Sequence, residues 1–134
     1  MPGCVLRVGS KTTDVELLIR ASRLKPVAVF RRGQPRAPGS THLNRQSGFN
    51  VDVSKVDRAL EKQVQDATRF LKRYAAGLTR LRRNEKCGGM TLDFGVYDRA
   101  TKERPWPSYR FPAALIELAG KHGIEIELSF YGPG

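Results

Sequence analysis

The chain has 134 residues, of which 40% are hydrophobic, so it has the length of one ordinary domain and enough apolar residues for a core. This composition argues against wholesale disorder, no apolar run reaches the roughly 18 residues of a membrane span, and no signal peptide is evident. We therefore expect one cytoplasmic domain over residues 1–134, outside the membrane, and its net charge of +11 predicts acidic partners.

The first third of the chain predicts a strand, a helix and a second strand. Apolar and polar residues alternate over residues 4–9, as they do in a half-buried strand. A capping box at residues 13–16 opens a helix that continues to about Leu24, where Pro26 excludes a further turn. The β-branched run over residues 27–30 then predicts a short strand.

Residues 32–47 predict a long loop that precedes a third strand. Glycine, proline, serine and asparagine are too frequent there for a regular element, and the loop is longer than most connections within a domain. We therefore predict that this loop is either functional or mobile. Alternation resumes over residues 48–53 and predicts a strand whose Phe49, Val51 and Val53 face the core.

The longest helical pattern in the chain covers residues 54–85. Apolar side chains recur there at spacings of three and four, which places them on one face of a helix, and basic side chains occupy the opposite face. Ser54 has the position and the chemistry of an N-cap. A straight helix of this length would reach roughly 45 Å and overhang a domain of this size, so we predict a break at residues 75–77.

Two further strands and one helix are predicted in the last third of the chain. Strict alternation over residues 90–97 predicts a strand, and residues 98–109 form a second long loop. Pro112 fits the first turn of a helix that ends at Gly123. Residues 124–131 again alternate between apolar and polar, which indicates a strand with one buried and one exposed face.

The predicted elements follow the order strand, helix, strand, strand, helix, strand, helix, strand. The first six of them match a ferredoxin-like βαββαβ core, to which a helix and a strand are appended. The polar faces of the strands over residues 90–96 and 124–130 are typical of antiparallel sheets. We therefore predict an α+β fold with a mainly antiparallel sheet and the helices on one face.

Several segments of the chain resemble a known family. They are the first strand and helix, the strand from Lys25-Pro26 into Arg31-Arg32-Gly33-Gln34, and the closing segment from Phe111-Pro112 to Gly123-Ile124-Glu125-Ile126-Glu127. In element order and hydrophobic pattern they resemble a family of small bacterial domains of unknown function, the one numbered four-two-seven-nine. That family has no assigned catalytic residues, so the resemblance implies no site residue in this chain.

No motif in the sequence assembles a catalytic, metal or cofactor site. His42 and His122 stand alone, without the spacing of metal ligands, and a solvated sheet face accounts for the glutamates of residues 125–127. Nucleophile-elbow, Walker and Rossmann patterns are absent. Cys4 and Cys87 are predicted as buried structural thiols rather than as a disulfide or a reactive thiol. These observations favour a non-enzymatic protein without metal or cofactor, and they leave an enzyme as the third possibility after two binding functions.

The best candidates for binding are arginines and one tryptophan. Residues 17–51 hold seven basic side chains and no acidic one, and residues 55–86 hold ten against four, so the positive charge lies in the middle of the chain. Guanidinium groups make planar, paired contacts with phosphate or carboxylate. The predicted contact residues are Arg31, Arg32 and Arg36 of the long loop, Arg69, Arg73 and Arg80 of the long helix, and Trp106 between two prolines.

These residues can be arranged in two ways. We expect the loop arginines and the helix arginines to lie side by side as one positive surface, and the alternative is that they are scattered, solvated charges. Trp106 is either a contact for a partner or a lid over the core. The predicted function is a binding module for an acidic protein or peptide. Non-specific nucleic-acid binding through residues 17–86 is the alternative.

Overall fold

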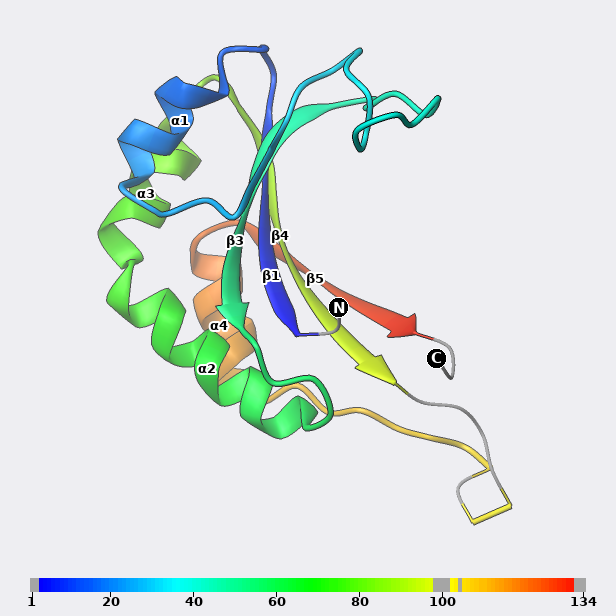
Figure 1. Cartoon of the computed structure of the whole chain (residues 1–134). Coiled ribbons are helices and arrows are strands. Elements are labelled where there is room, and N and C mark those ends of the chain that lie inside the picture. Colours follow the sequence, from blue (N-terminus) through cyan, green and yellow to red (C-terminus); the bar gives the residue numbers. More distant parts are fainter. Residues whose placement is uncertain (1–2, 98–101, 104, 132–134) are drawn as a thin grey trace.

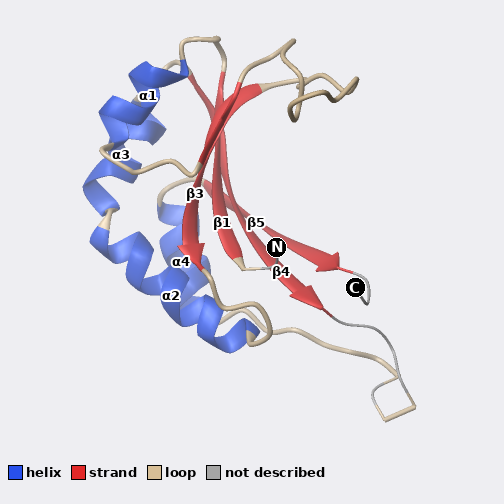
Figure 2. Ribbon diagram, in the orientation of Figure 1, coloured by secondary structure: helices blue, strands red, loops and turns tan. Residues whose placement is uncertain are grey.

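Within residues 3–97, 102–103 and 105–131, which the computed structural model describes, five strands form one sheet and four helices cover one of its faces (Figure 1 and Figure 2). The α+β class is thus confirmed. The strands are β1 (Cys4–Ser10), β2 (Ala28–Phe30), β3 (Ser47–Ser54), β4 (Cys87–Tyr97) and β5 (Ile124–Tyr131). The helices are α1 (Val15–Ser22), α2 (Leu60–Arg73), α3 (Ala75–Arg83) and α4 (Ala113–Lys121).

The sheet has the strand order β2-β3-β1-β4-β5 and is mixed. β3 pairs antiparallel with β2 and with β1, β1 pairs antiparallel with β4, and β5 pairs in parallel with β4. The prediction of a mainly antiparallel sheet is therefore wrong at β5. The chain reaches β5 from β4 through α4, and a helical crossover returns a chain in the direction of the preceding strand. The polar face of β5 arises because the helices leave one face of the sheet uncovered.

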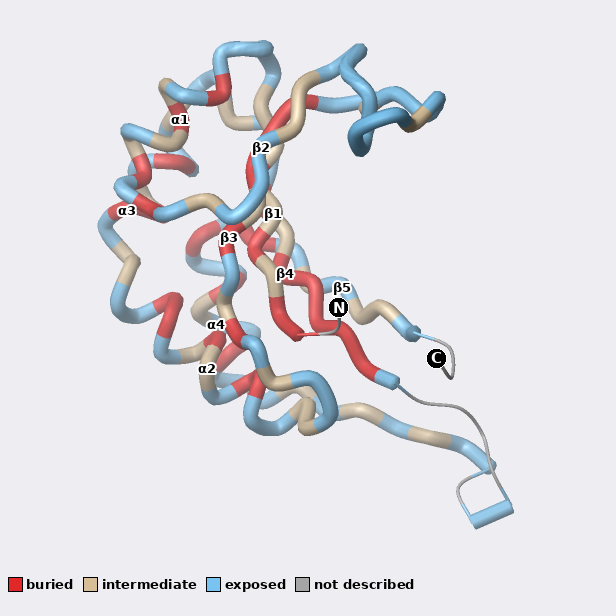
Figure 3. Tube along the Cα trace, in the orientation of Figure 1, coloured by how far each residue is buried: buried red, intermediate tan, exposed pale blue. Residues whose placement is uncertain are grey.

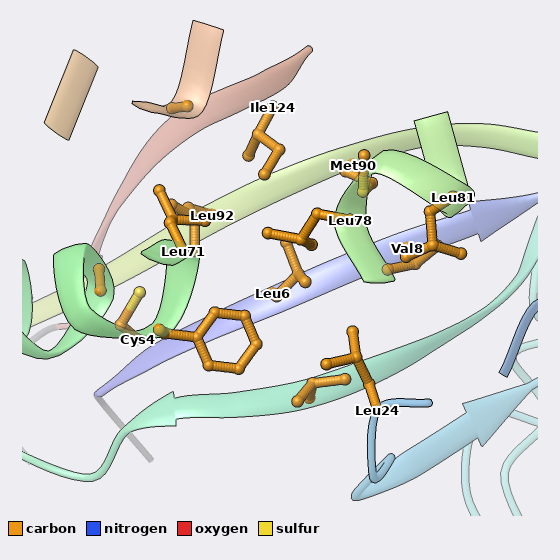
Figure 4. Packing of buried hydrophobic residues seen from close by; sticks show 14 of the residues in the cluster. Cys4, Leu6, Val8, Leu24, Leu71, Leu78, Leu81, Met90, Leu92 and Ile124 are labelled. Carbon is orange, nitrogen blue, oxygen red and sulfur yellow. The ribbon is translucent and has the colours of Figure 1, made fainter. Parts of the chain in front are cut away.

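The hydrophobic core lies between the helices and the sheet face that they cover. Leu6 and Val8 of β1 and Leu92 of β4 pack against Leu71 of α2 and Leu78 of α3, and all five side chains are fully buried (Figure 4). Figure 3 shows the same arrangement along the chain, with buried segments concentrated in the strands and on the inner sides of the helices. This layer fixes the position of α2 against the sheet.

The long helical pattern is divided into two helices at Tyr74, which lies between α2 and α3 (Figure 1). The predicted break is confirmed, slightly earlier in the chain than residues 75–77. The predicted start is wrong, because Ser54 ends β3 and α2 begins only at Leu60. The Ser54 hydroxyl donates to Asp66 at 2.7 Å, so it links β3 to α2 and does not cap the helix.

The bend at Tyr74 allows α3 to pack closely on α1. Gly77 of α3 lies so near to α1 that a Cβ atom at this position would overlap the carbonyl oxygen of Ser22. One turn later, Nε of Arg80 donates to the carbonyl oxygen of Ala21 at 2.6 Å. The C-terminal end of α1 is therefore held by one close backbone approach and one charge-assisted hydrogen bond.

The long loop between β2 and β3 folds back on itself as a small hairpin. The N–H of Gly33 donates to the Asn44 carbonyl at 2.9 Å, that of Asn44 to Gln34 at 2.8 Å, and that of Arg36 to His42 at 2.9 Å. The hairpin extends beyond the end of the sheet on the side away from the helices (Figure 1). This backbone order explains how sixteen residues rich in glycine and proline keep a defined shape.

Candidate functional site

β2 covers only part of the outer edge of β3. It pairs with residues 48–50, and the position that would next face Asp52 is Pro26. Proline has no N–H to donate, so the ladder ends there. The Asn50 carbonyl accepts from the N–H of Val27 at 2.8 Å. Because backbone groups alternate in direction along a strand, those of Asp52 point to the same, uncovered side.

A groove of about 630 Å³ lies between this uncovered edge of β3 and α2. α2 forms one wall, and the connection from α1 to β2 forms the other. We call it the basic groove, because four cationic side chains line it against two carboxylates. Its residues are the basic Arg23, Lys25, Arg69 and Arg73, the acidic Asp52 and Asp66, and the apolar or aromatic Leu24, Val51, Val53, Phe70 and Tyr74.

Two of the predicted arginines stand one helical turn apart on the α2 wall of the groove. Arg69 is ion-paired with Asp66, which also accepts the hydroxyl of Ser54. The guanidinium carbon of Arg73 lies 5.3 Å from the ring centroid of Tyr74, within range of a cation–π contact. These contacts hold both guanidinium groups at the groove, where they can meet carboxylate or phosphate groups of a ligand.

The opposite wall carries Arg23 and Lys25, which the sequence reasoning did not single out. Arg23 caps α1 with a left-handed backbone, φ 59°, and its N–H donates to Ile19 at 3.0 Å. Glycine is the usual residue in such a position, because a side chain there costs about 1 kcal/mol. The chain thus keeps a guanidinium on the groove wall at a conformational cost. The signal available in the sequence was this basic pair directly before Pro26.

Replacing Arg23 by glycine is expected to raise the free energy of unfolding by about 0.5–1 kcal/mol, because it relieves the left-handed backbone. Urea denaturation measures the change. The matched control is Arg20→Gly, an exposed position within α1, which is expected to lower stability by about 1 kcal/mol. A loss of stability in Arg23→Gly would show that the arginine side chain contributes more through its contacts than its backbone conformation costs.

The three loop arginines lie outside the basic groove. Arg31 is ion-paired with Glu16 of α1. Arg32 lines a separate hollow of about 400 Å³ with Arg45, and Arg36 belongs to the exposed loop hairpin. The hairpin and α2 lie on opposite sides of the sheet (Figure 1). The expectation that loop and helix arginines form one surface is therefore wrong, because Arg31 is held at α1 and the hairpin extends away from α2.

The remaining two predicted residues are also separate from the groove. Arg80 follows the bend at Tyr74 and is bound to the end of α1, so it does not continue the stripe of Arg69 and Arg73. Trp106 is 87% exposed, which shows that it does not cover the core. Whether these two residues contact a partner remains a prediction of the sequence.

The helix-free face of the sheet carries a second polar cluster. Arg7 of β1 pairs with Asp93 of β4 at 2.7 Å and also with Glu127 of β5, and Ser129 donates to Asp93 at 2.6 Å. A hollow of about 230 Å³ adjoins Arg7 and Glu125. The charged groups of this cluster are paired with one another, whereas Arg23, Lys25 and Arg73 of the basic groove make no ion pair within the described residues, so the cluster offers a ligand less than the groove does.

Two buried titratable groups are kept uncharged by their surroundings. Burial raises the pKa of the Cys4 thiol far above its ordinary range, and the nearby Asp93 and Asp66 raise it further. Burial lowers the pKa of His122, and the positive charges of Lys121 and Arg82 add to this effect. Cys4 is buried as predicted, whereas Cys87 is only half-buried, and both cysteines are free.

Stability is expected to fall as the pH drops below about 6.5, the ordinary pKa of histidine, because unfolding then allows His122 to take up a proton. The contribution is fully present at higher pH and is lost as the pH falls towards the lowered folded-state pKa. Urea denaturation at several pH values measures it. His122→Gln should flatten this part of the profile. Equal slopes for the wild type and His122→Gln would contradict the assignment.

The fold and the groove define the class of protein: an α+β domain with a basic groove, whose described residues hold no group of three or more potential metal ligands. In the same part of the chain, no helix is both long and apolar enough to cross a membrane. The chain belongs to the family described as domain of unknown function (DUF4279), whose model matches residues 3–133. The resemblance seen in the sequence is thereby confirmed. No curated protein and no solved structure matched the chain.

Proposed function

We propose that this protein is a non-enzymatic binding module whose basic groove holds an acidic, extended segment of a partner protein. The observation that carries the proposal is the position of four basic side chains beside an uncovered strand edge. Either feature alone is common on protein surfaces. Together they match an extended ligand that has a free main chain and negative side chains.

Such a segment can use both features at once. Its main chain pairs with the outward-facing backbone groups of Asp52, as when a peptide adds a strand to an exposed sheet edge. Side chains of an extended peptide alternate between two sides. Acidic ones then meet Arg69 and Arg73, while apolar ones pack on the groove surface near Val53 and Phe70.

The charge around the groove also favours encounter with an acidic partner. α2 and α3 together hold seven basic and two acidic residues, so the helical layer is positive well beyond the groove itself. A surface of this kind raises the association rate with an acidic partner at low salt. Arg31, Arg32 and Arg36 lie outside the groove, and a partner would need a second segment to reach them.

The second candidate is non-specific nucleic-acid binding through residues 17–86, because the same positive charge attracts phosphates. One observation favours a peptide over a nucleic acid, since Asp52 and Asp66 in the groove repel both kinds of ligand. The rings of Phe70 and Tyr74 lie 4.7 Å apart and pack on each other, so they do not stand free to stack on bases.

We also propose that β1 to β4 and α1 to α3 form a ferredoxin-like core, to which α4 and β5 are appended. The order β2-β3-β1-β4, antiparallel at every pair, supports this assignment. In such an arrangement the basic groove lies at the β2 edge of the core, and the appended β5 forms the opposite edge of the sheet.

Fluorescence anisotropy with the full chain tests the proposed function. The probe is a labelled nine-residue peptide of alternating glutamate and valine, compared with its lysine counterpart. A third peptide carries N-methyl groups on alternate residues. We expect the glutamate peptide to bind at least about tenfold more tightly than the lysine peptide. N-methylation in the pairing register should weaken binding by a similar factor, because it removes the main-chain donors.

The salt dependence of binding distinguishes nucleic-acid binding from peptide binding in the same assay. A labelled oligonucleotide bound through Z phosphates loses affinity steeply with salt, with a slope of about −0.9Z on duplex DNA. Tighter binding of the oligonucleotide than of the glutamate peptide would establish the nucleic-acid function instead. Equal binding of the glutamate and lysine peptides, or no binding of either, would overturn the peptide proposal.

A further inference from the structure

β5 forms the edge of the sheet opposite the basic groove, and it is unusually open for an edge strand. It is eight residues long, and in the described part of the chain β4 is its only neighbour in the sheet. Natural proteins usually protect such an edge with proline, charged side chains, a bulge or a very short strand. β5 contains neither proline nor lysine, its two charges, Glu125 and Glu127, both lie on the helix-free face, and its pairing with β4 is regular throughout.

The exposed apolar side chains near this edge point to a protein partner. Phe130 of β5 is 60% exposed and Tyr131 is 39% exposed. α4, which packs against β5, exposes Ile116 to 52% together with the small residues Ala113 and Gly120. Phe130 and Tyr131 point to opposite faces of the sheet, so a strand added to this edge would meet one exposed ring on each face.

We propose that two copies of this chain pair β5 with β5, antiparallel, to form one continuous sheet with Leu128 on the two-fold axis. A strand edge is self-complementary in this way, since each copy supplies the donors and acceptors that the other lacks. The α4 helices then lie side by side next to the same axis, on the helical face of the joined sheet.

The sequence of β5 favours this register over those centred on Glu127 or Ile126, and the register pairs residues 125–131, whereas one centred on Ser129 would pair only residues 127–131. Residues directly opposite each other in an antiparallel pair point to the same face, so the register is set by the residue on the axis. With Leu128 there, Glu127 faces Ser129, Glu125 faces Tyr131, and Ile126 faces Phe130. With Glu127 on the axis, this carboxylate would face its own copy. With Ile126 on the axis, Glu125 would face Glu127 across the interface.

The local charge at this edge is small, although each copy has a net charge of +11. α4 and β5 together hold one basic residue, Lys121, and three acidic ones, of which Glu127 is ion-paired with Arg7. The excess of positive charge lies within residues 17–86 instead, and the basic groove opens at the opposite edge of the sheet, beside β2 and β3. A β5 pair therefore leaves both grooves free.

Sedimentation velocity at protein concentrations from about 1 to 100 μM measures the association. The wild type should approach twice the mass of one chain, and Phe130→Lys should raise the dissociation constant at least about tenfold. A wild type that stays monomeric over the whole range would overturn the proposal.

Disulfide cross-linking tests the register independently. In a Cys87→Ser background, Glu125→Cys and Tyr131→Cys are made as separate single variants. Opposite residues in an antiparallel pair lie about 4.5–5.5 Å apart at Cα, within reach of a disulfide. We expect a mixture of the two variants to form a covalent dimer under oxidation, and each variant alone to form none. Cross-linking of either single variant with itself, or none in the mixture, would contradict the register.

Discussion

Replacing Arg69 and Arg73 together by glutamate is expected to weaken binding of the glutamate–valine peptide at least about tenfold, which corresponds to ~1.4 kcal/mol. The two side chains line one wall of the basic groove, four positions apart on α2. The substitution turns two attractive charges into repulsive ones, and like charges facing each other across an interface are strongly unfavourable. Anisotropy titrations at about 50 mM salt measure the change, and a higher salt concentration should reduce it.

The matched control changes the same amount of charge outside the groove. Lys72→Glu and Arg83→Glu alter exposed residues of α2 and α3 that do not line it. We expect this pair to lower affinity less than threefold, through the general field of the helical layer alone. If both double variants weaken binding equally, the peptide is held by overall charge and the groove has no special role. Circular dichroism and urea denaturation verify that each variant is folded.

Replacing Gly77 by alanine is expected to destabilise the fold by about 1–3 kcal/mol, although alanine is the better helix former. The new Cβ atom would overlap the carbonyl oxygen of Ser22, a backbone atom that cannot rotate away. Relief of this overlap must separate α1 from α3 and loosen the hydrogen bond from Arg80 to Ala21. Urea denaturation gives the free energy of unfolding.

The same substitution in another helix should have the opposite sign. Gly120 of α4 is exposed, and no atom lies within 4 Å of the place that its Cβ would occupy. Gly120→Ala is therefore expected to stabilise the fold by up to about 1 kcal/mol, the gain in helix propensity. A higher free energy of unfolding for Gly77→Ala would contradict the close approach of α1 and α3 at this position.

Local patterns in the sequence predict the elements well wherever one face is buried and the other is not. The strand predicted over residues 124–131 has the bounds of β5, and Phe49 and Val51 of β3 are buried as predicted. Gly123 ends α4 with a positive φ of 67°, as its position in the sequence predicted. Each of these features depends on residues within one turn or one strand.

Features that depend on the packing of distant segments could not be predicted in the same way. Ser54 resembles a helix cap in the sequence, but its hydroxyl binds a carboxylate of α2 twelve residues later. The direction of β5 depends on the crossover through α4, and alternation is the same for parallel and antiparallel edge strands with one open face.

The basic groove shows this limit most clearly. Its cations come from the end of α1, the connection before β2, and α2, which only the sheet brings together. The sequence identified Arg69 and Arg73 because they share one helix face. It did not identify Arg23 and Lys25 as their partners, because no spacing links them. It also grouped Arg69 with Arg36, which belongs to the loop hairpin and does not line the groove.

Hydrogen exchange at the backbone amide of Asp52 tests the central claim most directly. This N–H points to the uncovered edge of β3 in the free protein, whereas that of Val51 points to β1. We therefore predict faster exchange at Asp52 than at Val51 without ligand, and at least about tenfold slower exchange at Asp52 when the glutamate–valine peptide saturates the protein. Unchanged exchange at Asp52, with new protection in the loop hairpin or on the helix-free sheet face, would contradict binding in the basic groove.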